Sequence, residues 1–416
     1  MSEKCAIHLA LIASITLVTA PSIAAQNEPA EANTGQEKPS FAQCINGIQT
    51  MATQAGIADE FIKRALDDVQ HIDKALEYDR NQPEFVQTFP NYLNKRVTQW
   101  RIDKGRQMLR KHATLLSDLT QRFGVPAHYL IAFWGLETNF GGIKGKMSTI
   151  DSLATLACDP RRSGFFTEEL ITAMRLMERE NLAKSKMIGS WAGAMGHTQF
   201  MPSAYINYAM DGDEDGVVDL WDSEEDALTS AANFLSKLGW QAGFIWGREV
   251  LLPENFDYSH AGKDNRLSLS EWSTKGIHKA DNKRLPESDI QASLLVPTGA
   301  NGPAFLVYKN FDVIMRWNNS ESYAIAVGYL ADKLIGKSDW VTALPDLPTY
   351  PIAKMVVLQE NLNQLGFDVG KPDGIVGPAT RRGIRNFQKS VDLVADGYPG
   401  EHVFDALQQV LAQKTL

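Results

Sequence analysis

Apolar residues recur with the spacing of amphipathic helices over most of the first 340 residues. Between about 247 and 312 the pattern changes to short β-prone runs that Pro and Gly residues separate. We therefore expect a mainly α fold over residues 41–340, with a small mixed α/β subdomain inserted at 247–312. Helical spacing includes stretches near 166–182, 224–238 and 320–335, and the positions Ile45, Ile48, Phe61, Leu66, Val69, Met108, Leu109, Leu115, Leu116 and Leu119.

A proline-rich stretch at residues 341–352 is the clearest linker. Pro345, Pro348 and Pro351 recur at intervals of three, which favours extended backbone. Beyond it, amphipathic helices near 353–365, 378–389 and 401–412, joined by Gly-rich turns, predict a separate three-helix module at 353–416. Its expected core positions are Leu362, Leu365, Ile384, Phe387, Phe404 and Leu407.

The first 25 residues have the pattern of a secretory signal peptide: Lys4, an apolar run over 9–20, and small residues around Ala24. A short membrane anchor is the alternative, but the run is shorter than the roughly 20 residues that a spanning helix needs. Cys5 precedes the apolar run, which argues against a lipoprotein attachment. Residues 26–40 lack apolar periodicity and predict a flexible leader. We expect an exported protein that is soluble once cleaved, without a membrane span.

Two cysteines, Cys44 and Cys158, remain after the expected cleavage. An even pair in an oxidising compartment indicates a disulfide, and two unpaired buried thiols are the alternative.

The charge balance bears on the kind of partner. The chain has 416 residues and a net charge of -9, and no Lys/Arg stripe with interleaved aromatic residues stands out. This argues against binding nucleic acid or an anionic membrane by bulk electrostatics. We expect a partner that is recognised by shape and hydrogen bonds.

One carboxylate stands at the end of an intensely apolar helical segment. Residues 128–136 are almost all apolar, Glu137 follows them, and turn residues at 138–142 come next. Burial of a carboxyl group raises its pKa, which is what a general acid requires near neutral pH. The spacing alone is equally consistent with Glu137 as a helix-end cap or salt-bridge partner.

A second segment, residues 190–203, combines Gly and Ala with polar side chains. Small residues allow a flat ligand such as a sugar ring to approach the backbone, and Ser190 and Gln199 can position hydroxyl groups or a water. A tight packing loop is the alternative. For His197 we favour a hydrogen-bonded loop histidine over an acid/base.

Three segments together resemble the lytic murein transglycosylase B family. They are 134–138 (WGLET), 193–203 (GAMGHTQFMPS), and 316–320 (RWNNS) with 323–327 (YAIAV). The resemblance covers residues 41 to 340 in the expected order. The C-terminal module, through Leu358, 365–367, 373–380, 387–388 and 396–397, resembles the three-helix peptidoglycan-binding domain.

The family resemblance implies a periplasmic enzyme with a lysozyme-like helical domain. Such an enzyme cleaves the β-1,4 bond between N-acetylmuramic acid and N-acetylglucosamine, and forms 1,6-anhydro-N-acetylmuramyl ends without water. Glu137 would act as acid and then as base, with no catalytic cofactor. Ser190, Gln199 and Asn318 would bind the sugar. Tyr323 would line the cleft with Trp317, which stands where the family often has Tyr.

A single carboxylate suffices for that reaction because the nucleophile belongs to the substrate, whereas ordinary glycosidases pair two. The quoted segments contain no second acidic residue. A hydrolytic muramidase and a non-catalytic wall-binding protein remain the alternatives. The module at 353–416 would tether the enzyme to the wall polymer.

An acidic loop, residues 211–222, matches the EF-hand spacing for Ca²⁺. Asp222 stands at position 12, where Glu is usual, and a solvated acidic turn is the alternative. The expected role of the ion is structural. The predicted ligands are Asp211, Asp213, Asp215, the carbonyl of Val217, Asp219 and Asp222.

Overall fold

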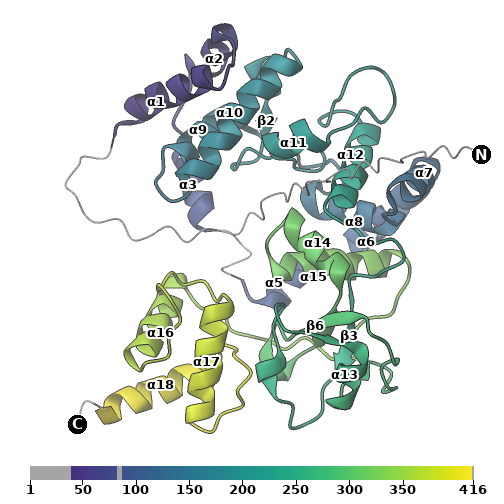
Figure 1. Cartoon of the computed structure of the whole chain (residues 1–416), viewed down its shortest axis with the longest axis vertical. Helices are drawn as coiled ribbons and strands as arrows, with labels where there is room; N and C mark the ends of the chain where they lie inside the picture. The colour runs from purple at the N-terminus through teal and green to yellow at the C-terminus, as the bar shows by residue number, and fades with distance from the viewer. Residues whose placement is uncertain (1–38, 82–86, 415–416) are drawn as a thin grey trace, which may run out of the picture. The chain divides into compact units, whose positions relative to one another are not determined.

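A computed structural model describes residues 39–81 and 87–414. The predicted signal peptide and nearly all of the predicted leader lie outside the described residues. Residues from Phe41 onward form one compact unit, in which helices dominate and a small sheet is inserted (Figure 1). The mainly α prediction with an inserted α/β subdomain is therefore confirmed.

Two helical layers make up the body, each around its own apolar core. The first core joins α1–α3 to later helices, because residues such as Ile48, Phe61 and Leu153 are buried together. Its helices are α1 (Phe41–Gln54), α2 (Asp59–Leu66), α3 (Asp73–Arg80), α9 (Thr149–Ala157), α10 (Ser163–Arg179) and α11 (Pro202–Tyr208). The strands β1 (Met147–Ser148) and β2 (Ile188–Gly189) pair antiparallel beside it, and the short 3-10 turn η1 (Lys184–Lys186) precedes β2.

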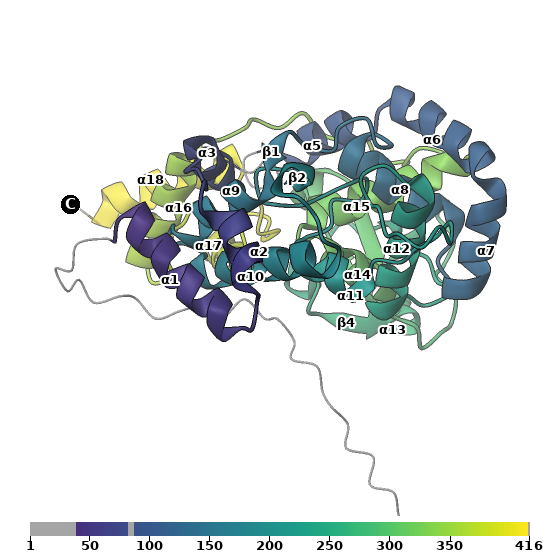
Figure 2. The same cartoon turned by 90° about the horizontal axis from the view of Figure 1, so that it is seen from above.

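The second core surrounds α8, which packs against α6, α12 and α15 (Figure 2). Residues 129–136 of α8 are all buried, as expected for a helix that is apolar on every side. The helices of this core are α5 (Phe89–Arg96), α6 (Gln99–Lys111), α7 (Ala113–Phe123), α8 (Ala127–Thr138), α12 (Glu224–Lys237), α14 (Lys309–Trp317) and α15 (Glu321–Leu334).

A five-stranded antiparallel sheet in the order β4-β6-β7-β3-β5 forms the inserted subdomain. Its strands are β3 (Gly247–Leu251), β4 (Arg266–Ser268), β5 (His278–Lys279), β6 (Gln291–Leu295) and β7 (Ala304–Val307), with α13 (Leu269–Thr274) and the 3-10 turns η2 (Tyr258–His260) and η3 (Gly299–Asn301). Trp272 of α13 is fully buried, and its indole N–H donates to the carbonyl of Ala292 at 2.9 Å. This contact fixes α13 to the sheet.

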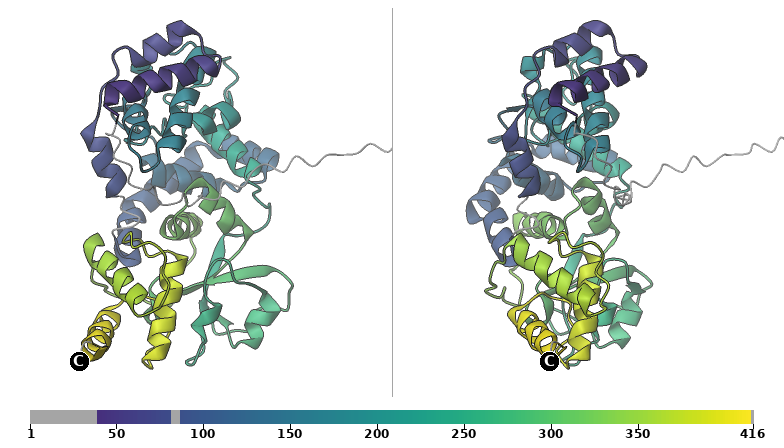
Figure 3. Two further views of the ribbon diagram at one scale, coloured as in Figure 1. Left: turned by 60° about the vertical axis from the view of Figure 1, so that its left-hand side comes forward. Right: turned by 90° about the vertical axis from the view of Figure 1, so that its left-hand side faces the viewer.

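The C-terminal residues contain three helices, drawn from light green to yellow in Figure 3: α16 (Ile352–Gln364), α17 (Pro378–Ser390) and α18 (Glu401–Lys414). All six predicted core positions lie in one apolar cluster: Leu362, Ile384, Phe387 and Leu407 are buried, and Leu365 and Phe404 pack against them. Within residues 39–81 and 87–414, no helix is both long enough and apolar enough to cross a membrane.

Candidate active site

Glu137 lies at the C-terminal end of α8, half-buried, after the fully buried turn that precedes it. The helix ends because Asn139 and Phe140 adopt left-handed backbone conformations, with φ of 52° and 60°. Arg101 of α6 is buried and secures this end, since its Nε donates to the carbonyl of Gly135 at 2.9 Å and to Asn139 Oδ1 at 3.2 Å. Glu137 therefore stands on a rigid support.

The side chains of Trp317 and Tyr323 both donate hydrogen bonds to the carboxylate of Glu137. Trp317 Nε1 donates to Glu137 Oε1 at 2.9 Å, and the Tyr323 hydroxyl donates to the same oxygen. Burial, followed by the nearby charge of Glu137, raises the pKa of Tyr323 well above its usual range, so this phenol remains a neutral donor. The structure thus brings together three residues that the sequence predicted from segments 180 or more positions apart.

Trp317 also forms part of an aromatic wall. Its ring lies 4.6 Å from that of Phe133, 5.1 Å from Phe234 and 5.5 Å from Phe200, measured between centroids. The family resemblance places Trp317 where Tyr is frequent, and an indole keeps a stacking surface but lacks the phenol hydroxyl. The structure shows that the indole N–H makes a hydrogen bond to Glu137 itself.

Asn318 and Glu321 follow Trp317. Asn318 ends α14 in an extended conformation and is half-buried. Glu321 stands between the family segments 316–320 and 323–327, in the first turn of α15. Residues two apart on a helix do not share a face, so Glu321 and Tyr323 point to different sides of α15.

The 190–203 segment folds back on itself as a tight loop. The backbone amides and carbonyls of Met195 and Phe200 pair at 2.8 and 2.9 Å. Ser190 Oγ accepts from the amides of Ala192 and Ala194 at 3.3 and 3.1 Å. Gln199 Nε2 donates to two carbonyls of the surrounding backbone, at 3.0 and 3.2 Å. Both predicted sugar ligands are therefore half-buried members of the loop framework, and their contact with sugar stays a prediction.

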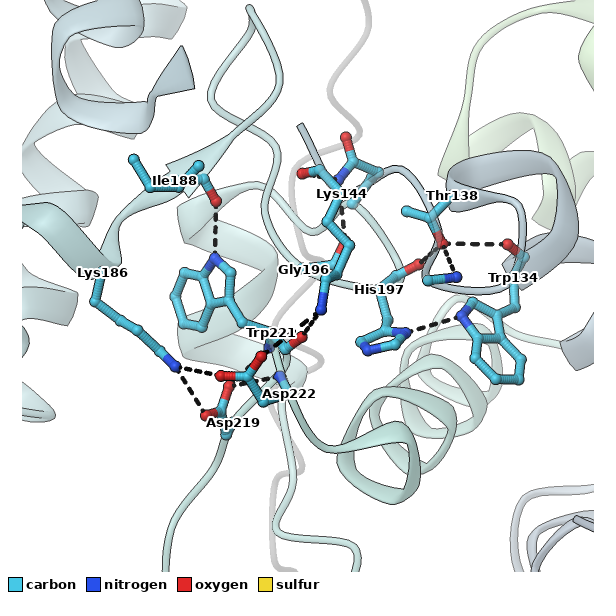
Figure 4. Close-up of polar contacts among 12 residues, drawn as sticks. Trp134, Thr138, Lys144, Lys186, Ile188, Gly196, His197, Asp219, Trp221 and Asp222 are labelled. Carbon is cyan, nitrogen blue, oxygen red and sulfur yellow. Dashed lines mark hydrogen bonds and ion pairs between the residues drawn. The ribbon is translucent and has the colours of Figure 1, made fainter. Parts of the chain in front are cut away.

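His197 joins this loop to α8 (Figure 4). Trp134 Nε1 donates to His197 Nδ1 at 3.1 Å, and Thr138 Oγ1 donates to the His197 carbonyl at 2.7 Å. Burial, with a smaller effect of Lys144, lowers the pKa of His197 to about 4. The ring is neutral at pH 7, which agrees with a hydrogen-bonded loop histidine. Gly141 packs so close that an added Cβ would lie 2.2 Å from the His197 ring.

The acidic loop differs in part from the predicted ligand set. Carboxylate oxygens of Asp211, Asp213 and Asp226 lie within 4.8 Å of one another, a donor set suited to a hard cation. Asp226, which the sequence prediction omitted, is buried in the first turn of α12 and accepts from the amides of Gly212 and Asp219 at 2.7 Å. Burial, opposed by these hydrogen bonds, raises its pKa.

The remaining predicted ligands are engaged elsewhere. Asp222 and Asp219 pair with Lys186 at 2.7 and 3.2 Å (Figure 4), and Asp215 Oδ1 accepts from the amide of Val217 at 2.8 Å. These carboxylates are not in the cluster of three, and their assignment as ligands, including Asp222 at position 12, stays a prediction.

Cys44 and Cys158 form a disulfide between α1 and the end of α9, with Cα atoms 5.9 Å apart and 114 positions between them in sequence. The predicted pairing is present. Sequence reasoning assigned no role to Arg101, Trp134 or Thr138, whose side chains position the end of α8 that carries Glu137. The sequence did contain a signal for the position of Asp226. Ser223 is the N-cap of α12, which places Asp226, three residues later, in the first turn of that helix beside the acidic loop.

Comparison with known proteins identifies the families to which the two parts of the chain are similar. Residues 40–332 match the "Transglycosylase SLT domain" family, and residues 353–407 match the "Putative peptidoglycan binding domain" family. The chain is 30% identical over 303 residues to membrane-bound lytic murein transglycosylase B of Escherichia coli (strain K12), which covers 68% of this chain and 80% of that protein.

Two solved structures extend the comparison. SltB3 from Pseudomonas aeruginosa in complex with NAG-anhNAM-pentapeptide is 41% identical, with a TM-score of 0.84 over 89% of this chain and 99% of that one. The Escherichia coli transglycosylase Slt35 in complex with calcium is 29% identical, with a TM-score of 0.62 over 72% of this chain and 93% of that one. The lysozyme-like prediction is confirmed by these transglycosylase neighbours. The chain belongs to the lytic murein transglycosylases with the SLT domain, and carries a C-terminal peptidoglycan-binding domain.

Proposed function

We propose that Glu137 is the acid and base of this transglycosylase. The observation that carries the proposal is the pair of donors, Trp317 Nε1 and the Tyr323 hydroxyl, on a single oxygen of its carboxylate. In its protonated form, the Glu137 carboxyl group would deliver its proton to the glycosidic oxygen between N-acetylmuramic acid and N-acetylglucosamine.

The second half of the reaction uses the same group in its ionised form. After the bond breaks, the Glu137 carboxylate takes the proton from the C6 hydroxyl of the muramyl residue, and O6 bonds to C1 to close the 1,6-anhydro ring. The two hydrogen bonds then stabilise the carboxylate charge. Trp317, Ser190, Gln199 and Asn318 would position the sugar in this scheme, by stacking in the case of Trp317.

Product analysis with a Glu137→Gln variant tests the assignment. We expect at least a thousandfold loss of turnover, of the size found when a group essential to catalysis is removed, with sacculus binding unchanged. Mass spectrometry of unreduced digests by the wild type should show anhydro-muramyl ends. A matched control is Glu168→Gln, an exposed carboxylate on α10, which should retain activity. Near-normal turnover of Glu137→Gln contradicts the assignment, and reducing ends with added water contradict the reaction.

The substrate of the reaction should carry stem peptides. This expectation is supported by SltB3, which was solved with NAG-NAM-pentapeptide at 42% identity to this chain. The module at 353–407 would hold the wall polymer near the catalytic cleft and raise its local concentration. Truncation after residue 344 should weaken sacculus binding and leave cleavage of soluble, peptide-free strands intact.

A structural Ca²⁺ ion fits the acidic loop. Asp211, Asp213 and Asp226 would hold it, with the Val217 carbonyl as a further candidate. The ion would offset most of the negative charge of three adjacent carboxylates and fix the loop to the first turn of α12. Added calcium should therefore raise the melting temperature of the chelator-treated enzyme, and an unchanged value contradicts the site.

We also propose export to the periplasm as a soluble protein, from the signal-peptide pattern of residues 1–25. N-terminal sequencing of the mature protein should begin near residue 25 or 26. An intact N-terminus, or a lipid-modified cysteine, contradicts this route.

A further inference from the structure

A large cavity lies beside the N-terminus of α15. Its volume is about 970 Å³, at the upper end of the range for ligand pockets. Residues 319–322, the 257–265 loop of the inserted subdomain and helix α17 contribute to its wall. Asn319 is two residues from Trp317, so their Cα atoms are at most about 7 Å apart. The cavity therefore begins close to Trp317 in the chain, although Glu137, Trp317 and Tyr323 are not among the residues that line it.

One wall of the cavity is strongly basic. Arg381, Arg382, Arg385 and Lys389 of α17 all line it, and none of the four has a carboxylate oxygen within ion-pair distance among the described residues. Burial, then repulsion from the two neighbouring arginines, lowers the pKa of Arg385. These cations repel one another, and the attraction of Arg385 to Asp396 and Asp257, which also line the cavity, offsets only part of this repulsion. An anionic ligand would relieve it further.

The cavity also has acidic groups away from α17. Asp257 and Asp264 line it from the inserted subdomain. Asp264 pairs with Lys263 at 3.0 Å, and Asp257 lies 3.8 Å from the ring of His260. A wall that presents both signs of charge suits a ligand that carries carboxylates together with a cationic group, such as a peptide, better than a neutral polysaccharide.

We propose that this cavity binds the stem peptide of the muramyl residue, with peptide carboxylates on the basic wall of α17, while the sugar is held at Glu137. The inference rests on the proposed function, because it places the peptide next to the sugar that Glu137 cleaves. A peptide of five residues spans at most about 18 Å when extended. That reach exceeds the separation of at most about 7 Å between the Cα atoms of Trp317 and Asn319, the latter a residue of the cavity wall.

Kinetics on two matched substrates test the proposal. Glycan strands with their stem peptides are compared with the same strands after enzymatic removal of the peptides, using the full-length chain. Arg382 and Lys389 are exposed, so the double variant Arg382→Gln/Lys389→Gln should fold. We expect KM to rise about tenfold on peptide-bearing strands, as for loss of two charge-assisted contacts, with kcat unchanged. The peptide-free strands should show no change in KM.

Two further arms make the test specific. Arg110→Gln, an exposed arginine on α6 outside the cavity wall, should leave KM unchanged on both substrates. Raising the salt concentration should reduce the difference between wild type and double variant on peptide-bearing strands, because salt screens partly exposed charges.

The outcomes separate the two proposals. An equal rise in KM on both substrates means that α17 binds the polysaccharide and overturns the peptide assignment, and so does an unchanged KM on peptide-bearing strands. By contrast, absence of anhydro-muramyl product from both substrates with wild-type enzyme is a failure of the proposed function.

Discussion

His197 should make the catalytic body sensitive to acid. Its pKa is lowered from 6.5 to about 4 in the folded protein, mainly by burial, whereas in the unfolded chain it returns to its ordinary value. Between these two values the unfolded chain binds a proton that the folded protein does not bind. The free energy of unfolding therefore falls as the pH decreases from about 6.5 to about 4.

The size of this effect follows from the two pKa values. Linkage gives a loss of about 2 kcal/mol between pH 7 and pH 4.5 from His197 alone. The pKa of His128 is also lowered to about 4, chiefly by burial, and adds a loss in the same direction. Carboxylates titrate in the same range, so the contribution of His197 must be isolated as a difference between variants.

Urea unfolding of wild type and His197→Gln at both pH values provides that difference. All 9 tryptophans precede residue 341, so their fluorescence reports on the body and not on the C-terminal module. The variant should be less stable at pH 7 but should lose about 2 kcal/mol less than wild type on acidification. His402→Gln, at an exposed position on α18, is the matched control and should follow wild type. Parallel losses in wild type and His197→Gln would refute a buried neutral imidazole.

Three other perturbations test the framework of the site. Replacing Cys44 and Cys158 by Ser should lower the free energy of unfolding by about 4–5 kcal/mol, because the disulfide closes a long loop, as urea titration can measure. Gly141→Ala should cost about 2–4 kcal/mol and reduce cleavage, since φ is +80° and the new Cβ would contact the His197 ring. Asp226→Asn should abolish the calcium-dependent rise in melting temperature, measured by calorimetry.

Each of these perturbations has its own control. Reductant should reproduce the cysteine result, and stability equal to that of wild type contradicts the contribution of the disulfide. Gly164→Ala meets no atom within 4 Å and has no positive φ, so it should be neutral, and neutrality of Gly141→Ala would contradict the packing argument. Asp222→Asn should retain a calcium response, whereas loss of the response only in Asp222→Asn restores the EF-hand assignment.

The apolar pattern predicted those elements that are long and have buried residues at regular intervals. The helices near 353–365, 378–389 and 401–412 correspond to α16, α17 and α18. The β-prone runs predicted between 247 and 312 include the strands β3, β6 and β7. Strands β4 and β5 have 3 and 2 residues, too few for a periodic pattern. Sheet pairing from distant segments determines such strands, and local propensity does not.

The candidate metal site shows a different limit of sequence reasoning. Loop spacing placed the final ligand at Asp222, whose carboxylate instead pairs with Lys186 at 2.7 Å. Asp226, in the first turn of α12, lies beside Asp211 and Asp213 instead, and two backbone amides donate to its carboxylate. The direction of a side chain depends on how the next helix packs, and spacing within a loop does not contain that information.

The sequence by itself determined the family, the division into elements, and the position of Glu137 after a helix that is apolar on every side. Only the tertiary structure decided that Trp317 and Tyr323 donate to one oxygen of Glu137, and that Arg101 and His197 hold the end of α8 in place. The physical reason is that periodicity and composition record whether a residue is buried. The partner of a buried polar group depends on which distant segments the folded cores bring into contact.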